Sequence, residues 1–288
     1  MTQDTNAAWK DDLLLGAVAE DPAVVTIWDA FKAWLNKRGF PFDYILYTNY
    51  DRMVADLIDG RIDVAWNTPL AWIRAQRMAE KVGKQLDAVA MRDIDRDLTS
   101  LIAVSADSDI KSVDDLKGKV FGVGSRDSVE SLIMPCGVLQ DAGLVPGDDF
   151  QLRYYSDVLG LHGGDQAGEV RAAQALVAGE VDAAGLATGN YEQYVEDGTI
   201  PAGATRVLAH TPLYDHCNMT VSASAPRELI QRMRELFVEM DSTDPELREA
   251  MELQVVKKWQ PARLTHYGTL RRAVEQFDAV GGVVPAHS

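Results

Sequence analysis

The sequence predicts an α/β fold with two lobes, and three observations indicate it. Short apolar runs alternate with longer amphipathic segments along most of the chain, a pattern typical of strands joined by helices. The chain has 288 residues, which is enough for two lobes or one large domain. One stretch is also repeated: "RMVADLIDGRIDVAWNT" (52–68) aligns with "RAAQALVAGEVDAAGLAT" (171–188). The repeat predicts two lobes of like topology.

In the aligned copies Gly60 corresponds to Gly179 and Asp63 to Asp182, so each copy is a helix, a glycine stop and an apolar strand. We expect the first lobe at 12–95 plus 210–288, the second at 100–205, and an N-terminal extension at 1–11.

The individual elements follow from periodicity and from stop signals. Pro22 and Gly39 bracket one helix, and Thr68 and Pro69 supply the N-cap and first position of another. Strands are expected at 12–18, 42–47, 62–66, 100–105, 119–124, 150–155, 181–186, 205–210 and 218–223. Helices are expected at 22–39, 50–60, 68–83, 129–142, 166–178 and, in a helical C-terminal tail, 226–240, 244–258 and 266–280.

Composition limits the function. Acidic residues outnumber basic ones by 44 to 28, a net charge of −16, which argues against binding to nucleic acid or to an anionic membrane surface. No run approaches the roughly 20 apolar residues that cross a bilayer, so no membrane insertion is expected. No signal-peptide pattern opens the sequence, which predicts a cytoplasmic protein, or a periplasmic one if a signal peptide has been removed. Two cysteines, Cys136 and Cys217, make no disulfide framework.

Ligands of open α/β sheets gather where strands end and helices begin, so two facing lobes place two sets of such ends across one cleft. The segments expected to line it are "AED" (19–21), "WNTP" (66–69), "GSRDSVES" (124–131), "LHGGD" (161–165), "ATGN" (187–190) and "YDHC" (214–217).

Three longer stretches resemble one family: "NYDRMVADLIDGRIDVAWNTPLAWI", "DIKSVDDLKGKVFGVGSRDSVESLIMPCGVLQDAGL" and "LHGGDQAGEVRAAQALVAGEVDAAG". Their order is similar to that of the periplasmic substrate-binding proteins of phosphonate/phosphite-type ABC importers, and the likeness covers about 12 to 240. The resemblance implies a type II periplasmic-binding-protein fold, with two Rossmann-like lobes around a ligand cleft, and an ABC permease as partner if the chain is exported.

Carried over residue by residue, the resemblance implies a particular set of ligand contacts. Tyr50 would lie at the cleft edge and Thr68 would offer a hydroxyl. Ser125, Ser128 and Ser131 fall where the family grips an oxyanion. His162 matches a cleft histidine, and 214–217 form the return crossover. The full predicted ligand-binding set is Tyr50, Trp66, Asn67, Thr68, Ser125, Asp127, Ser128, Glu130, His162, Tyr214 and His216.

The turn "SRDSVES" departs from the family pattern. Val129 and Glu130 stand where small donors are expected, and Asp127 precedes them. A buried carboxylate repels an oxyanion by several kcal/mol, unless Arg126 turns inward to compensate. Glu130 therefore favours a cationic, hydrogen-bond-donating or metal-bearing ligand. The alternative is that Glu130 is an ordinary first-turn acid of its helix.

The stretch "LYDHCNMTV" (213–221) places an acid, an imidazole and a thiol side by side. If 216–221 is extended, His216 and Cys217 face opposite sides, and Cys217 belongs to the core. Trp66, at the end of its strand, is the candidate for a cleft wall that stacks on the ligand.

Three classes of function follow. The leading one is a solute-binding protein or soluble sensor that clamps a small polar molecule without a cofactor. The second is a cytosolic lyase or hydrolase on the same scaffold, with His162, Glu130, Cys217 and His216 as catalytic groups. A metal-assisted variant would use His162, His216 and Glu130, with Asp215 or Cys217 as further ligands. The third is a scaffold protein that binds its partner through 226–280.

Overall fold

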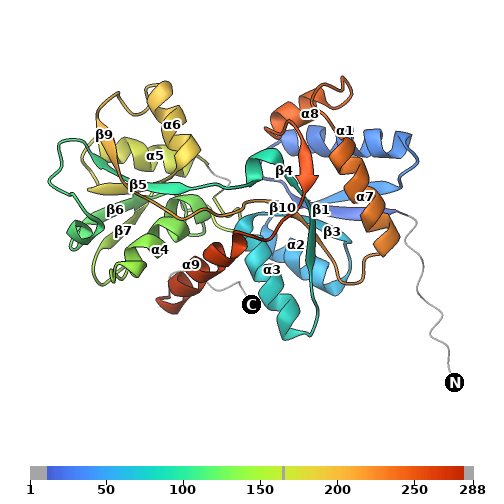
Figure 1. Ribbon diagram of the computed structural model, residues 1–288, viewed down its shortest axis with the longest axis horizontal. Coiled ribbons are helices and arrows are strands. Elements are labelled where there is room, and N and C mark those ends of the chain that lie inside the picture. Colours follow the sequence, from blue (N-terminus) through green and yellow to red (C-terminus); the bar gives the residue numbers. More distant parts are fainter. Residues whose placement is uncertain (1–11, 164–165, 282–288) are drawn as a thin grey trace.

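The computed structural model describes residues 12–163 and 166–281, and it contains two lobes side by side (Figure 1). The first lobe is built on a six-stranded sheet with the order β11-β4-β10-β3-β1-β2, and the second on a five-stranded sheet with the order β7-β6-β8-β5-β9. The predicted two-lobed α/β fold is therefore confirmed. The expected N-terminal extension, 1–11, lies outside the described residues.

The elements have the following bounds. The strands are β1 (Leu13–Val18), β2 (Phe42–Tyr47), β3 (Val64–Asn67), β4 (Asp87–Arg92), β5 (Ser100–Ser105), β6 (Val120–Val123), β7 (Gln151–Tyr154), β8 (Ala183–Ala187), β9 (Thr205–His210), β10 (Asn218–Val221) and β11 (Trp259–Pro261). The helices are α1 (Ala23–Lys37), α2 (Tyr50–Asp59), α3 (Pro69–Lys81), α4 (Met134–Asp141), α5 (Gln166–Val177), α6 (Thr188–Glu196), α7 (Arg227–Glu239), α8 (Arg248–Leu253) and α9 (Tyr267–Ala279). Single turns are η1 (Asp93–Asp95), η2 (Val113–Leu116) and the π-helical η3 (Val129–Ile133).

Most predicted elements are confirmed, and the exceptions are local. The elements β4, α6 and β11 were not predicted. The helix expected at 244–258 is wrong in extent, because α8 covers only Arg248–Leu253 and β11 follows it. Thr68 caps α3 as predicted, since its side chain accepts a hydrogen bond from the backbone N–H of Ala71.

The internal repeat is a structural repeat. Four strands of the first sheet, β2-β1-β3-β10, have the same order and the same relative directions as β7-β6-β8-β5 in the second. Asp63 accepts a hydrogen bond from the N–H of Leu14 at 2.9 Å, and Asp182 accepts the equivalent bond from Val120 at 2.8 Å. The aligned aspartates thus fix the start of β1 in the first lobe and of β6, its counterpart, in the second.

The C-terminal helix α9 leaves the first sheet and packs on the second lobe. It lies beside α4 and the end of α3 (Figure 1) and contributes Leu270, Val274 and Phe277 to an apolar cluster that joins second-lobe residues with residues of α3. Gly137 of α4 permits this approach, because a Cβ there would lie 3.1 Å from the Cβ of Ala273. The segment beyond 210 was expected in the first lobe; within it, α9 packs on α4 of the second lobe and also bonds to α3 of the first, through Arg271 and Gln76.

Three segments connect the lobes: the chain after η1, the return between β9 and β10, and the link from β11 to α9. Asp215, in the return segment, is fully buried and joins all three. Its carboxylate accepts hydrogen bonds from the backbone of Asp97, from the guanidinium of Arg263 and from the backbone of His266. Asp215 is therefore the central acceptor of the hinge.

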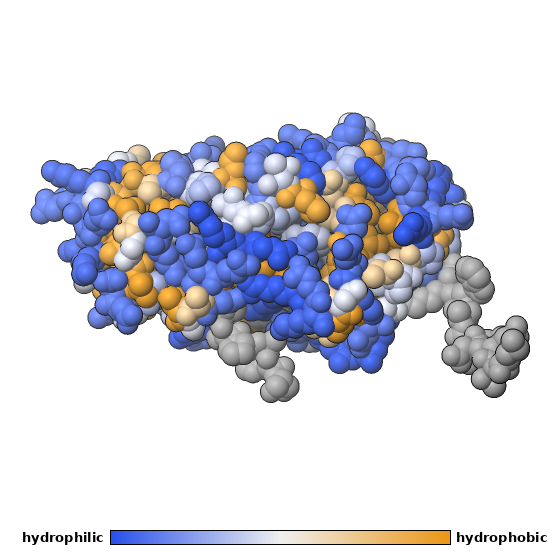
Figure 2. Space-filling view, turned by 60° about the horizontal axis from the view of Figure 1, so that its bottom comes forward, coloured by the Kyte–Doolittle hydropathy of each residue, from blue (hydrophilic) through white to orange (hydrophobic). Residues whose placement is uncertain are grey.

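The face of the molecule shown in Figure 2 is largely hydrophilic. In Figure 2 the hydrophobic residues of the visible face form separate groups among polar ones. Within the described ranges, every helix is too short or too polar to cross a lipid bilayer.

Candidate ligand cleft

The cleft contains a contact between the lobes that joins Glu130 of η3 to His216 of the return segment. Glu130 Oε1 lies 2.5 Å from His216 Nε2, and Glu130 Oε2 accepts a hydrogen bond from the hydroxyl of Ser128 at 3.2 Å. Ser128 also caps η3 by accepting from the N–H of Ser131. The predicted turn 125–131 therefore reaches the other lobe through a carboxylate.

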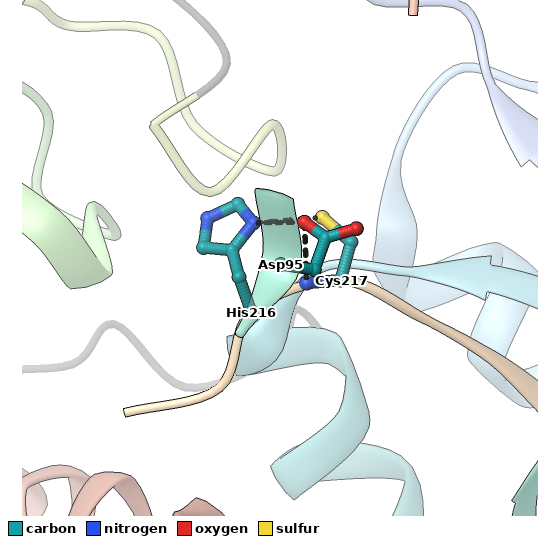
Figure 3. Close-up of side chains that lie close together, drawn as sticks. All are labelled: Asp95, His216 and Cys217. Carbon is teal, nitrogen blue, oxygen red and sulfur yellow. Dashed lines mark hydrogen bonds and ion pairs between the residues drawn. The ribbon is translucent and has the colours of Figure 1, made fainter. Parts of the chain in front are cut away.

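The other side of the His216 ring faces the hinge. His216 Nδ1 lies 3.2 Å from Asp95 Oδ1 and 3.1 Å from Cys217 Sγ, and Asp95 Oδ1 also accepts from the N–H of Cys217 at 3.3 Å (Figure 3). Asp95 ends η1 and is held by two charge-assisted hydrogen bonds from Arg92, at 2.7 and 2.8 Å. Both nitrogens of one imidazole thus face anionic or polarisable groups.

These contacts set the protonation of the cluster. Burial alone would lower the pKa of His216, but Cys217, Asp95 and Glu130 together raise it well above its usual range. Burial would raise the pKa of Glu130, yet the hydrogen bond and charge of His216 lower it. Burial raises the pKa of the Cys217 thiol, which His216 only partly offsets. The carboxylates of Asp95 and Glu130 thus favour the protonated imidazole, and burial favours the protonated thiol.

A second carboxylate of the first lobe, Glu20, lies in the segment after β1. It accepts a hydrogen bond from the hydroxyl of Tyr50 at 2.7 Å. Burial raises the pKa of Glu20, and its charge interacts with His216, Glu130 and Arg92. The charges of Glu20 and Glu130, which come from different lobes, thus interact with each other.

The loop 156–163 of the second lobe contacts the first lobe through His162. His162 Nδ1 lies 2.7 Å from Thr68 Oγ1, its Nε2 lies 3.0 Å from the guanidinium of Arg74, and its ring stacks on Tyr50 with centroids 4.7 Å apart. Burial and the charge of Arg74 lower the pKa of His162 well below its usual range, so it is neutral. The predicted residues Tyr50, Thr68 and His162 are therefore brought together.

The carboxylate of Asp127 anchors this loop by accepting hydrogen bonds from its backbone. Its Oδ2 accepts from the backbone N–H of Gly160 at 2.7 Å and of His162 at 3.3 Å, and its Oδ1 accepts from the hydroxyl of Ser125. Gly160 in turn accepts a hydrogen bond from the N–H of Tyr50, across the lobe boundary. Asp127 and Ser125 shape the loop through these bonds.

Three predicted contact residues lie in packed surroundings. Trp66 is 8% exposed and lies edge-on to Trp259, with the guanidinium of Arg92 over its ring. Asn67 is fully buried and donates to Thr220. Tyr214 is fully buried in the core of the second lobe, where its hydroxyl bonds to Ser100. Tyr214 therefore has a packing role and gives the cleft no side-chain contact.

The prediction that His216 and Cys217 face opposite sides is wrong. It assumed an extended strand from 216, but β10 begins at Asn218, where pairing with Asn67 starts. Residues 216 and 217 precede the strand, so alternation does not apply to them, and their side chains meet. The residues His162, His216 and Glu130, named only for the metal-assisted alternative, do not form one ligand set, because both ring nitrogens of His162 contact Thr68 and Arg74.

Four residues of this region were not named from the sequence: Glu20, Arg92, Asp95 and Glu169. Glu20 lies within the predicted "AED" segment, whereas Asp95 carries no local signal beyond Arg92 three positions earlier. Glu169, in the first turn of α5, accepts from the N–H of Ala187 and the amide of Asn190. Burial raises its pKa to about 8, and the charge of Glu130 adds to the shift.

A family model described as the periplasmic substrate-binding protein of a phosphonate ABC transporter matches residues 17–267. The chain belongs to this family. It is accordingly a small-molecule-binding protein of the ABC-transporter-related class. The resemblance given by the three quoted stretches is confirmed.

Solved structures share the fold at low sequence identity. A phosphonate-binding protein of Prochlorococcus marinus in complex with methylphosphonate is 16% identical, covers 94% of this chain and 98% of its own, and has a TM-score of 0.65. An ATP-bound protein of Xanthomonas citri is 16% identical over the same shares, with a TM-score of 0.71. A binding-protein component of a phosphonate transporter of Pseudomonas aeruginosa is 18% identical over 96% and 90%, with a TM-score of 0.61.

Proposed function

We propose that this binding protein takes a small ligand that is cationic or rich in hydrogen-bond donors, rather than a bare oxyanion. The observation that carries the proposal is the placement of Glu130. Its carboxylate stands where the resemblance predicts an oxyanion grip, and its side chain is only 16% exposed. Glu20, whose side chain is solvent-exposed, adds a second carboxylate that interacts with Glu130 and His216.

The magnitude of the repulsion supports this choice. Two like unit charges about 4 Å apart cost about 4 kcal/mol at an effective dielectric constant of about 20, close to a thousandfold in Kd. Arg92 offsets little of this, because both of its charge-assisted bonds are directed to Asp95. His216 is likewise placed between Glu130 and Asp95. The cationic groups of the cleft are thus already paired with protein carboxylates.

Isothermal titration calorimetry with the full chain tests the proposal. Choline, putrescine and 2-aminoethylphosphonate supply a cation, and methylphosphonate supplies an oxyanion alone. We expect at least one cationic probe to bind more tightly than methylphosphonate, and Glu130→Gln to weaken that binding about tenfold or more. Glu239→Gln, on the exposed end of α7, is the matched control. Tight binding of methylphosphonate that Glu130→Gln improves or leaves unchanged would contradict the proposal.

The proposal extends to the cellular compartment of the chain and to its membrane partner. The family consists of periplasmic components that work with a membrane permease. We propose that this chain delivers its ligand to such a permease when exported, and acts as a soluble sensor if it stays in the cytoplasm, as the sequence analysis expects. Fractionation of source cells followed by detection of the chain separates the two.

The enzymatic alternative gains no support from the family or the fold. Its nucleophile would be Cys217, but burial raises the pKa of that thiol. A protonated thiol is a poor nucleophile. We expect dialysis to release each bound probe chemically unchanged. Conversion of a probe into another compound would favour an enzyme.

A further inference from the structure

The cluster of Asp95, His216 and Cys217 combines one oxygen, one nitrogen and one sulfur donor, all within 4.8 Å of one another. Figure 3 shows the carboxylate and the thiol on the Nδ1 side of the imidazole. Asp95 ends η1, and His216 and Cys217 lie on the return segment beside it. All three donors therefore belong to the hinge and do not depend on closure of the lobes.

The spacing of the donors suits a small cation. Nδ1 lies 3.2 Å from Asp95 Oδ1 and 3.1 Å from Cys217 Sγ. A tetrahedral ion with bonds of about 2.0 to 2.3 Å separates its ligands by roughly 3.5 Å. Side-chain shifts of a few tenths of an ångström would open that space. Asp95 keeps its Arg92 contacts mainly through Oδ2 and one bond to Oδ1.

The surroundings resemble those that tune metal ligands. A metal-bound histidine commonly donates its second ring N–H to a carboxylate, which fixes the ring and increases its basicity. His216 Nε2 has this partner in Glu130, 2.5 Å away. The carbonyl of His216 also accepts a hydrogen bond from Tyr267, and Tyr267 accepts one from Asn218. Both ends of His216 are therefore held in place.

We propose that the cationic ligand of this cleft is a divalent transition-metal ion of the Zn²⁺ class, bound by Asp95 Oδ1, His216 Nδ1 and Cys217 Sγ, and that its binding displaces to solvent the protons that Nδ1 and Sγ carry in the metal-free chain. Mixed nitrogen, oxygen and sulfur donors select such ions over Mg²⁺ and Ca²⁺, which prefer oxygen ligands. Three protein ligands leave a fourth position for water or for a small molecule. This inference rests on the proposed function, since it specifies which cation the cleft takes.

Metal titration of the chelator-treated, dialysed full chain tests the inference. We expect one Zn²⁺ per chain by calorimetry and elemental analysis, no binding of Mg²⁺, and a thiolate-to-metal charge-transfer band with Co²⁺. Cys217→Ser should lose that band and weaken Zn²⁺ binding about hundredfold, whereas Glu130→Gln should weaken it about tenfold. Cys136→Ser is the matched control, because Cys136 is buried in the second lobe and should leave both signals unchanged.

The outcomes separate this inference from the proposed function. Absence of Zn²⁺ binding, or a Co²⁺ spectrum that Cys217→Ser leaves unchanged, would overturn the metal site. If the metal-free chain then binds choline or putrescine, the cationic cleft stands and only the metal assignment fails. Preference for methylphosphonate over every cation would overturn both. Circular dichroism of each variant shows that a lost signal does not come from a lost fold.

Discussion

Glu169 should make the stability of the second lobe depend on pH. Its carboxyl group is 7% exposed, and burial raises its pKa from 4.5 to about 8. A raised carboxyl pKa means that the folded chain binds a proton which the unfolded chain releases. The stabilisation from that proton is complete below pH 4.5 and is lost as the pH rises towards 8. Each pH unit in this interval costs about 1.4 kcal/mol.

Glu169→Gln removes the titration while keeping a carbonyl acceptor for Ala187 and Asn190. Between about pH 5 and about pH 7 the stability of the variant relative to the parent should rise by about 3 kcal/mol. Urea denaturation at both pH values, followed by circular dichroism, measures the difference. Glu192→Gln, an exposed position on α6, should show no such change. An equal gap between Glu169→Gln and the parent at both pH values would refute the reasoning.

Three further perturbations have definite expected outcomes. His162 is held neutral by burial and Arg74, so its contribution to stability is present above its usual pKa of about 6.5 and is lost on acidification. His162→Asn should therefore make hydrogen exchange in loop 156–163 less sensitive to acid. An unchanged pH profile of exchange would contradict this. Gly160 has a φ of 82° and lies against Asn49 of the other lobe, so Gly160→Ala should destabilise the closed form by about 1 kcal/mol and raise the ligand Kd about fivefold. The control is Gly147→Ala: Gly147 has a φ of 89° but open space around it, so Kd should not change. Asp215→Asn should lower the free energy of unfolding by about 2 kcal/mol in thermal melts, because it weakens the buried ion pair with Arg263. A loss no larger than that caused by neutralising a surface aspartate would show that this ion pair does not stabilise the connection between the lobes.

The sequence predicted the lobes well because their signals are local. The repeat contains a helix, a glycine with left-handed backbone and a strand in 17 or 18 residues, and both copies fold in this way. Strand β4, "DAVAMR", was missed because it is rich in alanine and charged at both ends, and Val89 is its only β-branched residue. Its place in the sheet depends on β10 and β11, which are distant in sequence.

The candidate site was predictable only in part. Glu130, His162 and His216 were found from their place in the expected loops. The meeting of His216 with Cys217 was missed because the start of β10 is fixed by long-range pairing with β3. Asp95 was missed because its partners His216 and Cys217 lie more than a hundred positions away, and only the folded chain brings the two crossovers together.

Three chain passages between the lobes, tied at Asp215, restrict the kind of motion available to the protein. A single passage would let one lobe swivel about its own axis. Connecting segments that are hydrogen-bonded to one another resist twisting, so the lobes should open by rotation about one fixed hinge axis. Because α1 belongs to the first lobe and α6 to the second, a pair of spin labels on these two helices would register each opening as one well-defined change in separation.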